Sequence, residues 1–286
     1  MKFVSFISSG DEGIAIENDG KFYGLLTGDL NYPGNLFGLI QAGGSALATA
    51  AKTLAQGDLI QLDKVTLLPP ISNPEKIVCV GLNYVDHSKE SGFETPTYPT
   101  IFNRFNSSLI AHDASILRPQ QSIQLDYEGE LVAIIGKDAK DIDEKDALDY
   151  VAGYSIFNDA SIRDYQFKAP QWTPGKNFDD TGAFGPYFVS ADVLPKGCKG
   201  LQLTTRLNGE VMQSASIDDM VFSVANLIST LSQFMTLRAG DLIVTGTPSG
   251  VGLARDPQVF MKAGDVVEVE IENIGLLSNP IEDRVK

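Results

Sequence analysis

The sequence has few of the residues that build soft metal sites, disulfides or nucleic-acid interfaces. Its 286 residues include two cysteines and two histidines. Cys79 and Cys198 are far apart and have no CxxC partner, which favours reduced thiols over a disulfide or metal ligands. Lys and Arg number 22 against 37 Asp and Glu, a formal charge of -15 with no basic run. Such a surface repels a phosphate backbone, so we expect no nucleic-acid partner.

Long apolar segments are also missing. The apolar stretch at the start, in MKFVSFISSGDEG, is too brief for the core of a signal peptide. No later run approaches the length needed to span a bilayer. The sequence therefore predicts a cytoplasmic protein with no membrane partner, and its 43% hydrophobic content is enough for a substantial core.

The pattern of apolar residues divides the chain into a small first part and a larger second part. Short strand-like runs precede FGLIQAGGSALATAAKTLA, an alanine-rich stretch typical of a helix. The segment LLPPISNPEK then carries three prolines, which interrupt regular structure. We predict a small N-terminal α/β module at residues 1–72 and a main domain at 73–286.

The main domain is rich in predicted strands and poor in helices. Strand-like runs are KIVCVGL, LVAIIGK, YVAGYSIFND, LQLTTRLNG, DLIVTG and DVVEVEIENIG. Helical patterns are confined to 85–91, 143–148 and SVANLISTLSQFMTL. The expected fold class is therefore mixed, β-rich α+β.

Three carboxylates stand at the start of one predicted core strand. In QLDYEGELVAIIGK, Asp126, Glu128 and Glu130 occupy alternate positions, and alternate side chains of a strand share a face. Burying an ionised carboxylate costs several kcal/mol, and clustering adds repulsion. The group must therefore be exposed, protonated or compensated by a bound cation.

A second strand favours the cation. YVAGYSIFND ends in Asp159, so two neighbouring strands can bring Glu128, Glu130 and Asp159 to one point. Hard oxygen ligands favour Mg²⁺, Mn²⁺ or Ca²⁺ over zinc. The alternative is a solvated strand face, which for an isolated E-x-E we would favour by roughly three to one. Asp126, nearest the preceding turn, is the weakest of the four and is expected outside the ligand set or in solvent.

Three further segments carry candidate groups. His87 has Glu90 three residues later, so on a helix the pair can activate water, although a solvated helix fits equally well. Lys176, in TPGKNFDDTGAFGP, is either a surface charge or a cation at a developing oxyanion. DLIVTGTPSGVG can cradle an anion or form a plain turn, and it matches neither the P-loop nor the Rossmann pattern.

Six segments in this order resemble the fumarylacetoacetate hydrolase family, and the likeness runs from about Lys76 to the C-terminus. They are GLNYVDHSKE, DYEGELVAIIGK, YVAGYSIFNDASIRDYQ, PGKNFDDTGAFGP, LNGEVMQ and AGDLIVTGTPSGVG. The resemblance implies a β-roll or sandwich catalytic domain of that family, usually a homodimer, preceded by a variable N-terminal module.

The resemblance also implies roles for individual residues. Glu128, Glu130 and Asp159 would hold Mg²⁺ or Mn²⁺, with Ca²⁺ as a substitute. By the same resemblance, His87 and Glu90 would activate water. Lys176 would face the substrate, and Arg163, Gln166 and Thr247 would lie near it. The chain departs from the family's Phe-x-Lys with Phe102-Asn103-Arg104. Arg104, expected at the substrate, keeps the charge but presents a planar fork, which puts substrate choice in question.

The implied activity is divalent-metal-dependent hydrolysis of a C–C bond in a 2,4-diketo acid, as in acylpyruvate hydrolases. The substrate would be a small keto acid, and the products a pyruvate-type acid and a second carboxylic acid. The same site also suits oxaloacetate decarboxylation, hydroxymuconate-type isomerisation and ureidoglycolate lyase chemistry. A non-catalytic protein would have lost some of these positions, and none is missing. Phosphoryl transfer is disfavoured because the chain lacks a recognisable nucleotide loop.

Overall fold

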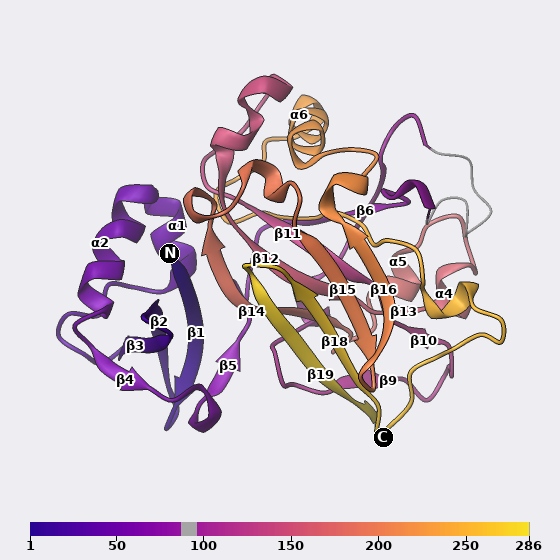
Figure 1. Ribbon diagram of the computed structural model, residues 1–286, viewed down its shortest axis with the longest axis horizontal. Coiled ribbons are helices and arrows are strands. Elements are labelled where there is room, and N and C mark those ends of the chain that lie inside the picture. The colour runs from indigo at the N-terminus through magenta and orange to yellow at the C-terminus, as the bar shows by residue number, and fades with distance from the viewer. Residues whose placement is uncertain (87–95, 286) are drawn as a thin grey trace.

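One mixed sheet runs through most of the molecule (Figure 1). The computed structural model describes residues 1–86 and 96–285. Within them, this sheet has twelve strands, and its main path runs β4-β3-β2-β1-β14-β12-β11-β17-β6-β7. In chain order the strands are β1 (Lys2–Ser8), β2 (Asp11–Asn18), β3 (Lys21–Leu26), β4 (Asp58–Ile60), β5 (Thr66–Leu68), β6 (Ile77–Gly81), β7 (Thr100–Asn103), β8 (Leu109–Ile110), β11 (Gly129–Ile135), β12 (Val151–Asp159), β14 (Gly182–Ser190) and β17 (Leu242–Val244).

The N-terminal residues form a small group of strands and helices at one side of the molecule (Figure 1). The alanine-rich stretch predicted as one helix is two, α1 (Leu36–Ala42) and α2 (Gly44–Leu54). The break falls at Gly43, whose φ of 91° lies in the region that glycine adopts most easily. Strand β1 pairs antiparallel with β14, so the strands of this group continue the sheet of the main part.

A second sheet of five strands packs on the first. Its order is β16-β15-β18-β19-β9, and a separate two-stranded sheet joins β10 to β13. The bounds of these strands are β9 (Ile116–Arg118), β10 (Leu125–Asp126), β13 (Ser161–Ile162), β15 (Gln202–Leu207), β16 (Glu210–Ser216), β18 (Val266–Ile271) and β19 (Gly275–Asp283). In the main part, the helices whose bounds lie within the described residues are α4 (Arg163–Gln166), α5 (Thr173–Lys176) and α6 (Val224–Phe234), with short 3-10 turns between strands.

Strand β11 is buried on both faces. Leu131, Ala133 and Ile135 pack into the core that includes the five-stranded sheet. Val132 and Ile134 face the opposite way, into the core formed with the N-terminal helices. A strand covered on both sides needs apolar residues at every position, which explains the unbroken run after Glu130.

The β-rich α+β class predicted from the sequence is confirmed. Strands β6, β11, β12, β15, β17 and β18 fall on the predicted runs, and α6 falls on SVANLISTLSQFMTL. The helix expected at 143–148 is the 3-10 helix η3 (Glu144–Tyr150). The helix expected at 85–91 falls mostly outside the described residues. Among the described helices, we find none with the length and apolar character needed to cross a membrane.

Candidate active site

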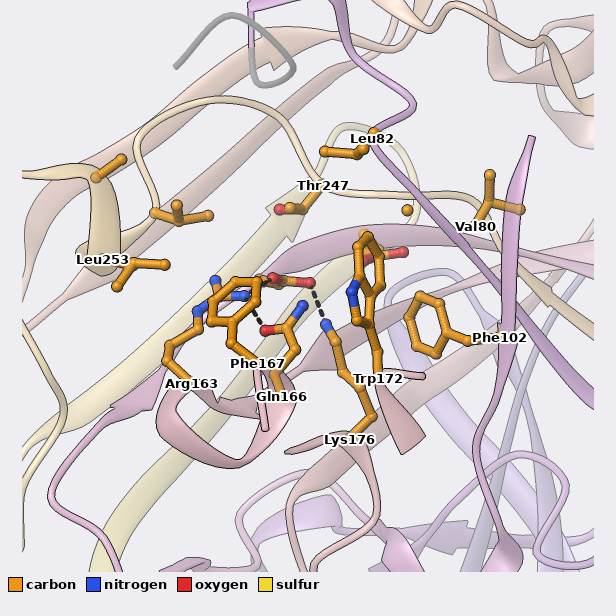
Figure 2. A pocket seen from close by; sticks show the side chains of 15 residues that line it. Val80, Leu82, Phe102, Arg163, Gln166, Phe167, Trp172, Lys176, Thr247 and Leu253 are labelled. Carbon is orange, nitrogen blue, oxygen red and sulfur yellow. Dashed lines mark hydrogen bonds and ion pairs between the residues drawn. The ribbon is translucent and has the colours of Figure 1, made fainter. Parts of the chain in front are cut away.

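A cavity of about 310 Å³ opens at the end of the central strands (Figure 2). Side chains from α4, α5 and the segment between them enter from one side, and Thr247 and Leu253, from the segment after β17, enter from another. The described residues that line it are Val80, Gly81, Leu82, Phe102, Glu128, Glu130, Arg163, Gln166, Phe167, Trp172, Lys176, Thr247, Val251, Leu253 and Ala254. The wall is therefore largely apolar, with a few charged groups gathered at one end.

The three carboxylates predicted to meet lie together beside this cavity. Strands β11 and β12 pair antiparallel, with Gly129 opposite Asn158, so the start of one strand adjoins the end of the other. This register places Glu128 and Glu130 beside Asp159, with one ligand oxygen of each within 4.8 Å of the others. All three side chains are buried. They are therefore not a solvated strand face.

Buried cations compensate part of this charge. Lys176 Nζ lies 2.7 Å from both Glu128 Oε2 and Asp159 Oδ2. Burial alone would lower the pKa of Lys176, but the carboxylates of Asp159 and Glu128 outweigh it and raise the pKa. The pKa of Glu130 rises well above its ordinary value, because it is buried and lies near the other two carboxylates. Lys176 is thus a buried cation of the cluster and not a surface charge.

Asp126 does not share the face of the other acids. The strand is interrupted between Asp126, in β10, and Gly129, where β11 begins, so simple alternation does not hold there. Its carboxylate is fully buried and accepts hydrogen bonds from the backbone N–H groups of Gly252 and Leu253, at 2.8 and 2.9 Å, and from Arg163 Nε at 2.8 Å. Asp126 therefore supports Arg163 and the wall of the cavity, and the expectation that all three acids point the same way is wrong.

Arg163 and Gln166 both line the cavity from α4. Arg163 Nη1 lies 2.6 Å from Glu128 Oε1 and donates to Gln166 Oε1 at 2.9 Å. The buried Nη2 of Arg163 has no hydrogen-bond partner among the described residues. A buried donor without a partner is costly, so it marks a position where a ligand acceptor would be favoured.

Thr247 also lines the cavity, but its hydroxyl is already engaged. It donates to the carbonyl of Gly129 at 3.0 Å and accepts from Gln213 Nε2 at 2.8 Å. These bonds tie the segment after β17 to the start of β11. Gln213 was not anticipated as a site residue. It is the last residue of LNGEVMQ, one of the six segments that carry the family resemblance, but the sequence does not indicate which groups its amide contacts.

Arg104, expected at the substrate, is not among the residues that line the cavity. Its guanidinium is buried behind Asp159, with Nη1 2.7 Å from Asp159 Oδ1. The residue contacts a member of the acidic triad and not the open space in front of it.

Trp172 is a site residue that the sequence did not reveal. Its ring packs edge-on against Phe102, with centroids 5.5 Å apart, and both line the cavity (Figure 2). Gly81 leaves room for the indole, because a Cβ at that position would lie 2.2 Å from Trp172 Cζ3. The chain has one tryptophan, and its place in QWTPGK, four residues before Lys176, is the signal that was available.

His87 and Glu90, predicted to activate water, lie outside the described residues. Their roles therefore stay predictions.

The donor set fits a hard divalent cation. Glu128, Glu130 and Asp159 offer carboxylate oxygens, with no cysteine or histidine among the grouped ligands. Mg²⁺ and Mn²⁺ prefer such oxygens, and buried carboxylates gain most from a cation. A carboxylate triad beside a small cavity is typical of enzymes that use a divalent metal.

Comparison with known proteins places the chain in one class. Residues 76–282, more than half of the chain, match the model of the fumarylacetoacetate hydrolase C-terminal domain. A mitochondrial oxaloacetate tautomerase of Xenopus laevis is 41% identical over 98% of this chain and 90% of its own length. A mitochondrial oxaloacetate tautomerase of Homo sapiens is 40% identical over 94% of this chain and 86% of its own length.

Solved structures of similar proteins support the same family assignment. A fumarylacetoacetate hydrolase from Exiguobacterium antarcticum is 36% identical, with a TM-score of 0.85, and the match covers 99% of this chain and 100% of that one. A 2-hydroxyhepta-2,4-diene-1,7-dioate isomerase from Mycobacterium marinum is 32% identical, with a TM-score of 0.78 over the whole of both chains. The chain belongs to the fumarylacetoacetate hydrolase family of enzymes, as its motifs predicted.

Proposed function

We propose that this enzyme interconverts the keto and enol forms of oxaloacetate, or of a closely related 2-oxo diacid, with the help of a divalent cation. The relatives named as oxaloacetate tautomerases share about 40% of their residues with nearly all of this chain. The observation in the structure that carries the proposal is the buried carboxylate triad beside a cavity that also presents Arg163.

The side chains of the cavity suit a small anionic substrate. Arg163 Nη2 can donate a hydrogen bond to a substrate carboxylate. Lys176 lines the same cavity and places positive charge where negative charge develops on the substrate. Apolar side chains, among them Phe167, Trp172 and Leu253, exclude water from the reacting groups.

The reaction needs no further reactant. A proton leaves carbon 3 of the keto form and a proton is added at the oxygen on carbon 2, so substrate and product are isomers. A divalent cation bound by the triad would supply positive charge that favours loss of that proton. We assign the proton transfer to His87, oriented by Glu90, on the basis of their spacing in the sequence.

A second candidate is hydrolysis of the C–C bond of an acylpyruvate. The pair His87 and Glu90 favours it, because such a pair can activate water. Water would add across the bond, giving a pyruvate-type acid and a second carboxylic acid. The described residues serve both reactions equally, so the products distinguish them.

The test is to add enolic oxaloacetate to the metal-loaded enzyme and follow loss of the ultraviolet absorbance of the enol. Turnover above the spontaneous rate is expected with Mg²⁺ or Mn²⁺ and little with EDTA. Release of CO₂ and cleavage of an acylpyruvate panel are measured on the same preparation. Activity on acylpyruvates with none on oxaloacetate would refute the tautomerase and favour the hydrolase.

Two glutamate variants provide the control. Glu128→Gln removes a charge from the triad and is expected to abolish metal-dependent turnover. Glu210→Gln makes the same change at an exposed position of β16, away from the cavity, and is expected to leave turnover unchanged. Equal activities in the two variants would contradict the assignment of the triad.

A further inference from the structure

The guanidinium of Arg104 is held on several sides by buried groups. Nη1 lies 2.7 Å from Asp159 Oδ1, and both side chains are fully buried. Nη2 donates to Thr181 Oγ1 at 2.7 Å, and Nε donates to Ser108 Oγ at 3.3 Å. The guanidinium is thus fixed at one end to the acidic triad and at the other to neutral hydroxyls.

The space around Arg104 is shaped for a planar group. The Cζ atom lies 5.6 Å from the ring centroid of Phe157. A Cβ at Gly182 would lie 3.0 Å from the same Cζ, so a larger residue there would press on the guanidinium. A lysine has one compact ammonium and no fork, and it cannot meet Asp159, Thr181 and Ser108 in this way.

Arg104 completes a pattern shared by the whole triad, in which one oxygen of each carboxylate is engaged by an arginine or a backbone N–H, while the other oxygens of Glu128 and Asp159 face the ammonium of Lys176. The three contacts are Arg163 Nη1 to Glu128 Oε1 at 2.6 Å, the N–H of Gly246 to Glu130 Oε2 at 2.5 Å, and Arg104 Nη1 to Asp159 Oδ1 at 2.7 Å. In each carboxylate, one oxygen is therefore held by a donor other than Lys176.

Cations differ in how they use carboxylates. Ca²⁺ takes six to eight oxygens and readily binds a carboxylate through both of them, whereas Mg²⁺ demands six ligands in an octahedron and keeps several waters. A triad with one oxygen of each member tied back offers single oxygens, which suits the smaller ion and deprives Ca²⁺ of two-oxygen contacts.

We propose that Arg104 is a positioning residue that restricts Asp159 to one available oxygen and so makes the triad prefer Mg²⁺ or Mn²⁺ over Ca²⁺. This inference rests on the proposed metal site. It gives Arg104 a role behind the triad, in place of the substrate contact expected from the sequence, and it disfavours Ca²⁺ as a substitute.

The experiment measures metal binding and not turnover. Metal-free enzyme is titrated calorimetrically with Mg²⁺, Mn²⁺ and Ca²⁺, and the rise in melting temperature with each metal is recorded. Changing a residue that orients a metal ligand typically costs about 10–100-fold in affinity. In Arg104→Lys, the affinity for Mg²⁺ is expected to fall about 10-fold or more, and that for Ca²⁺ by less, so the preference for Mg²⁺ shrinks.

Arg206→Lys is the matched control. It makes the same substitution on the five-stranded sheet, where Arg206 pairs with the half-exposed Glu270, and the metal affinities are expected to stay unchanged. An equal loss of affinity for all three metals in Arg104→Lys would mean a purely structural role, and unchanged affinities would mean no role. Either result overturns the inference.

A second variant covers a failure of Arg104→Lys to fold. Thr181→Val removes the nearer acceptor of Nη2, leaves the carbonyl of Ala160 at 3.4 Å and keeps the guanidinium, and it is expected to shift the Mg²⁺ to Ca²⁺ ratio in the same direction by a smaller factor. An unchanged ratio in this variant would also overturn the inference.

The two proposals fail in different ways. If the wild-type enzyme prefers Mg²⁺ and this preference shrinks in Arg104→Lys, but no 2-oxo acid is turned over, the proposed reaction is refuted and the role of Arg104 is supported. A wild-type enzyme that binds Ca²⁺ as tightly as Mg²⁺ overturns the inference whatever its turnover. Absence of binding to all three metals overturns both.

Discussion

Replacing Lys176 by methionine removes the cation that contacts two members of the triad at once. Its ammonium contacts Glu128 Oε2 and Asp159 Oδ2, each at 2.7 Å, and the side chain is 1% exposed. Methionine keeps an unbranched stem of similar length, so the change deletes charge with little loss of packing. Glu128 and Asp159 then each lose one of two buried cationic contacts and keep the other, to Arg163 and to Arg104 respectively.

The expected cost is large. Removing one partner of a buried ion pair destabilises a protein by about 3–5 kcal/mol, because the other charge stays buried and uncompensated. In a domain of this size that corresponds to a fall in melting temperature of roughly 6–20 °C, at 2–4 °C per kcal/mol. A divalent cation restores positive charge beside the carboxylates, so excess Mg²⁺ is expected to stabilise Lys176→Met more than the wild type.

Urea unfolding in EDTA and in excess Mg²⁺ checks this expectation. Lys145→Met serves as the control, since Lys145 is exposed and pairs with exposed acids, and a change within about 0.5 kcal/mol is expected. A loss below about 1 kcal/mol for Lys176→Met in EDTA would refute the reasoning. It would mean that the buried carboxylates do not depend on this ammonium.

Three further changes test two residues at the cavity and one partly buried histidine elsewhere in the fold. Asp126→Asn removes the charge that anchors Arg163, so the free energy of unfolding should fall by about 3 kcal/mol, and KM should rise more than kcat falls. Burial lowers the pKa of His112 from its ordinary value of about 6.5. As pH falls below that value, His112 of the unfolded chain binds a proton before His112 of the folded protein does, so the free energy of unfolding of the wild type declines. In His112→Asn, urea unfolding should show a free energy that depends less on pH over the same range. Gly81→Ala forces Trp172 aside, which should change Trp172 fluorescence and cost about 1–3 kcal/mol.

The triad was predictable because its signals are local. The run Leu131–Ile135 indicates a strand buried on both faces. An acid directly before this run and another acid at the end of the next apolar strand are exceptional positions for charged residues. Only the pairing of β11 with β12 had to be assumed. Consecutive strands are commonly neighbours, so that assumption had a physical basis.

Asp126 shows where local reasoning fails. Alternation predicts a shared face only while the strand continues, and the ladder of β11 begins at Gly129, after Asp126 has already paired with Ser161 in another sheet. The same limit explains the helix broken at Gly43, since a glycine inside an alanine-rich run can be tolerated or can end a helix. Which of these occurs depends on packing that the sequence does not state.

Arg104 shows that the sequence does not identify the partner of a long charged side chain. The sequence identifies the charge, but β7 and the segment after it decide that the guanidinium points behind Asp159. Arg104, Arg163 and Lys176 are the basic residues that could offset the acidic surface and attract an anionic substrate. In the structure each of them contacts a carboxylate of the site or its support, so little net positive charge is left among these described side chains. If the substrate is a diacid, the attraction must come mainly from the cation that the triad would hold, while the arginines and the lysine set shape and direction.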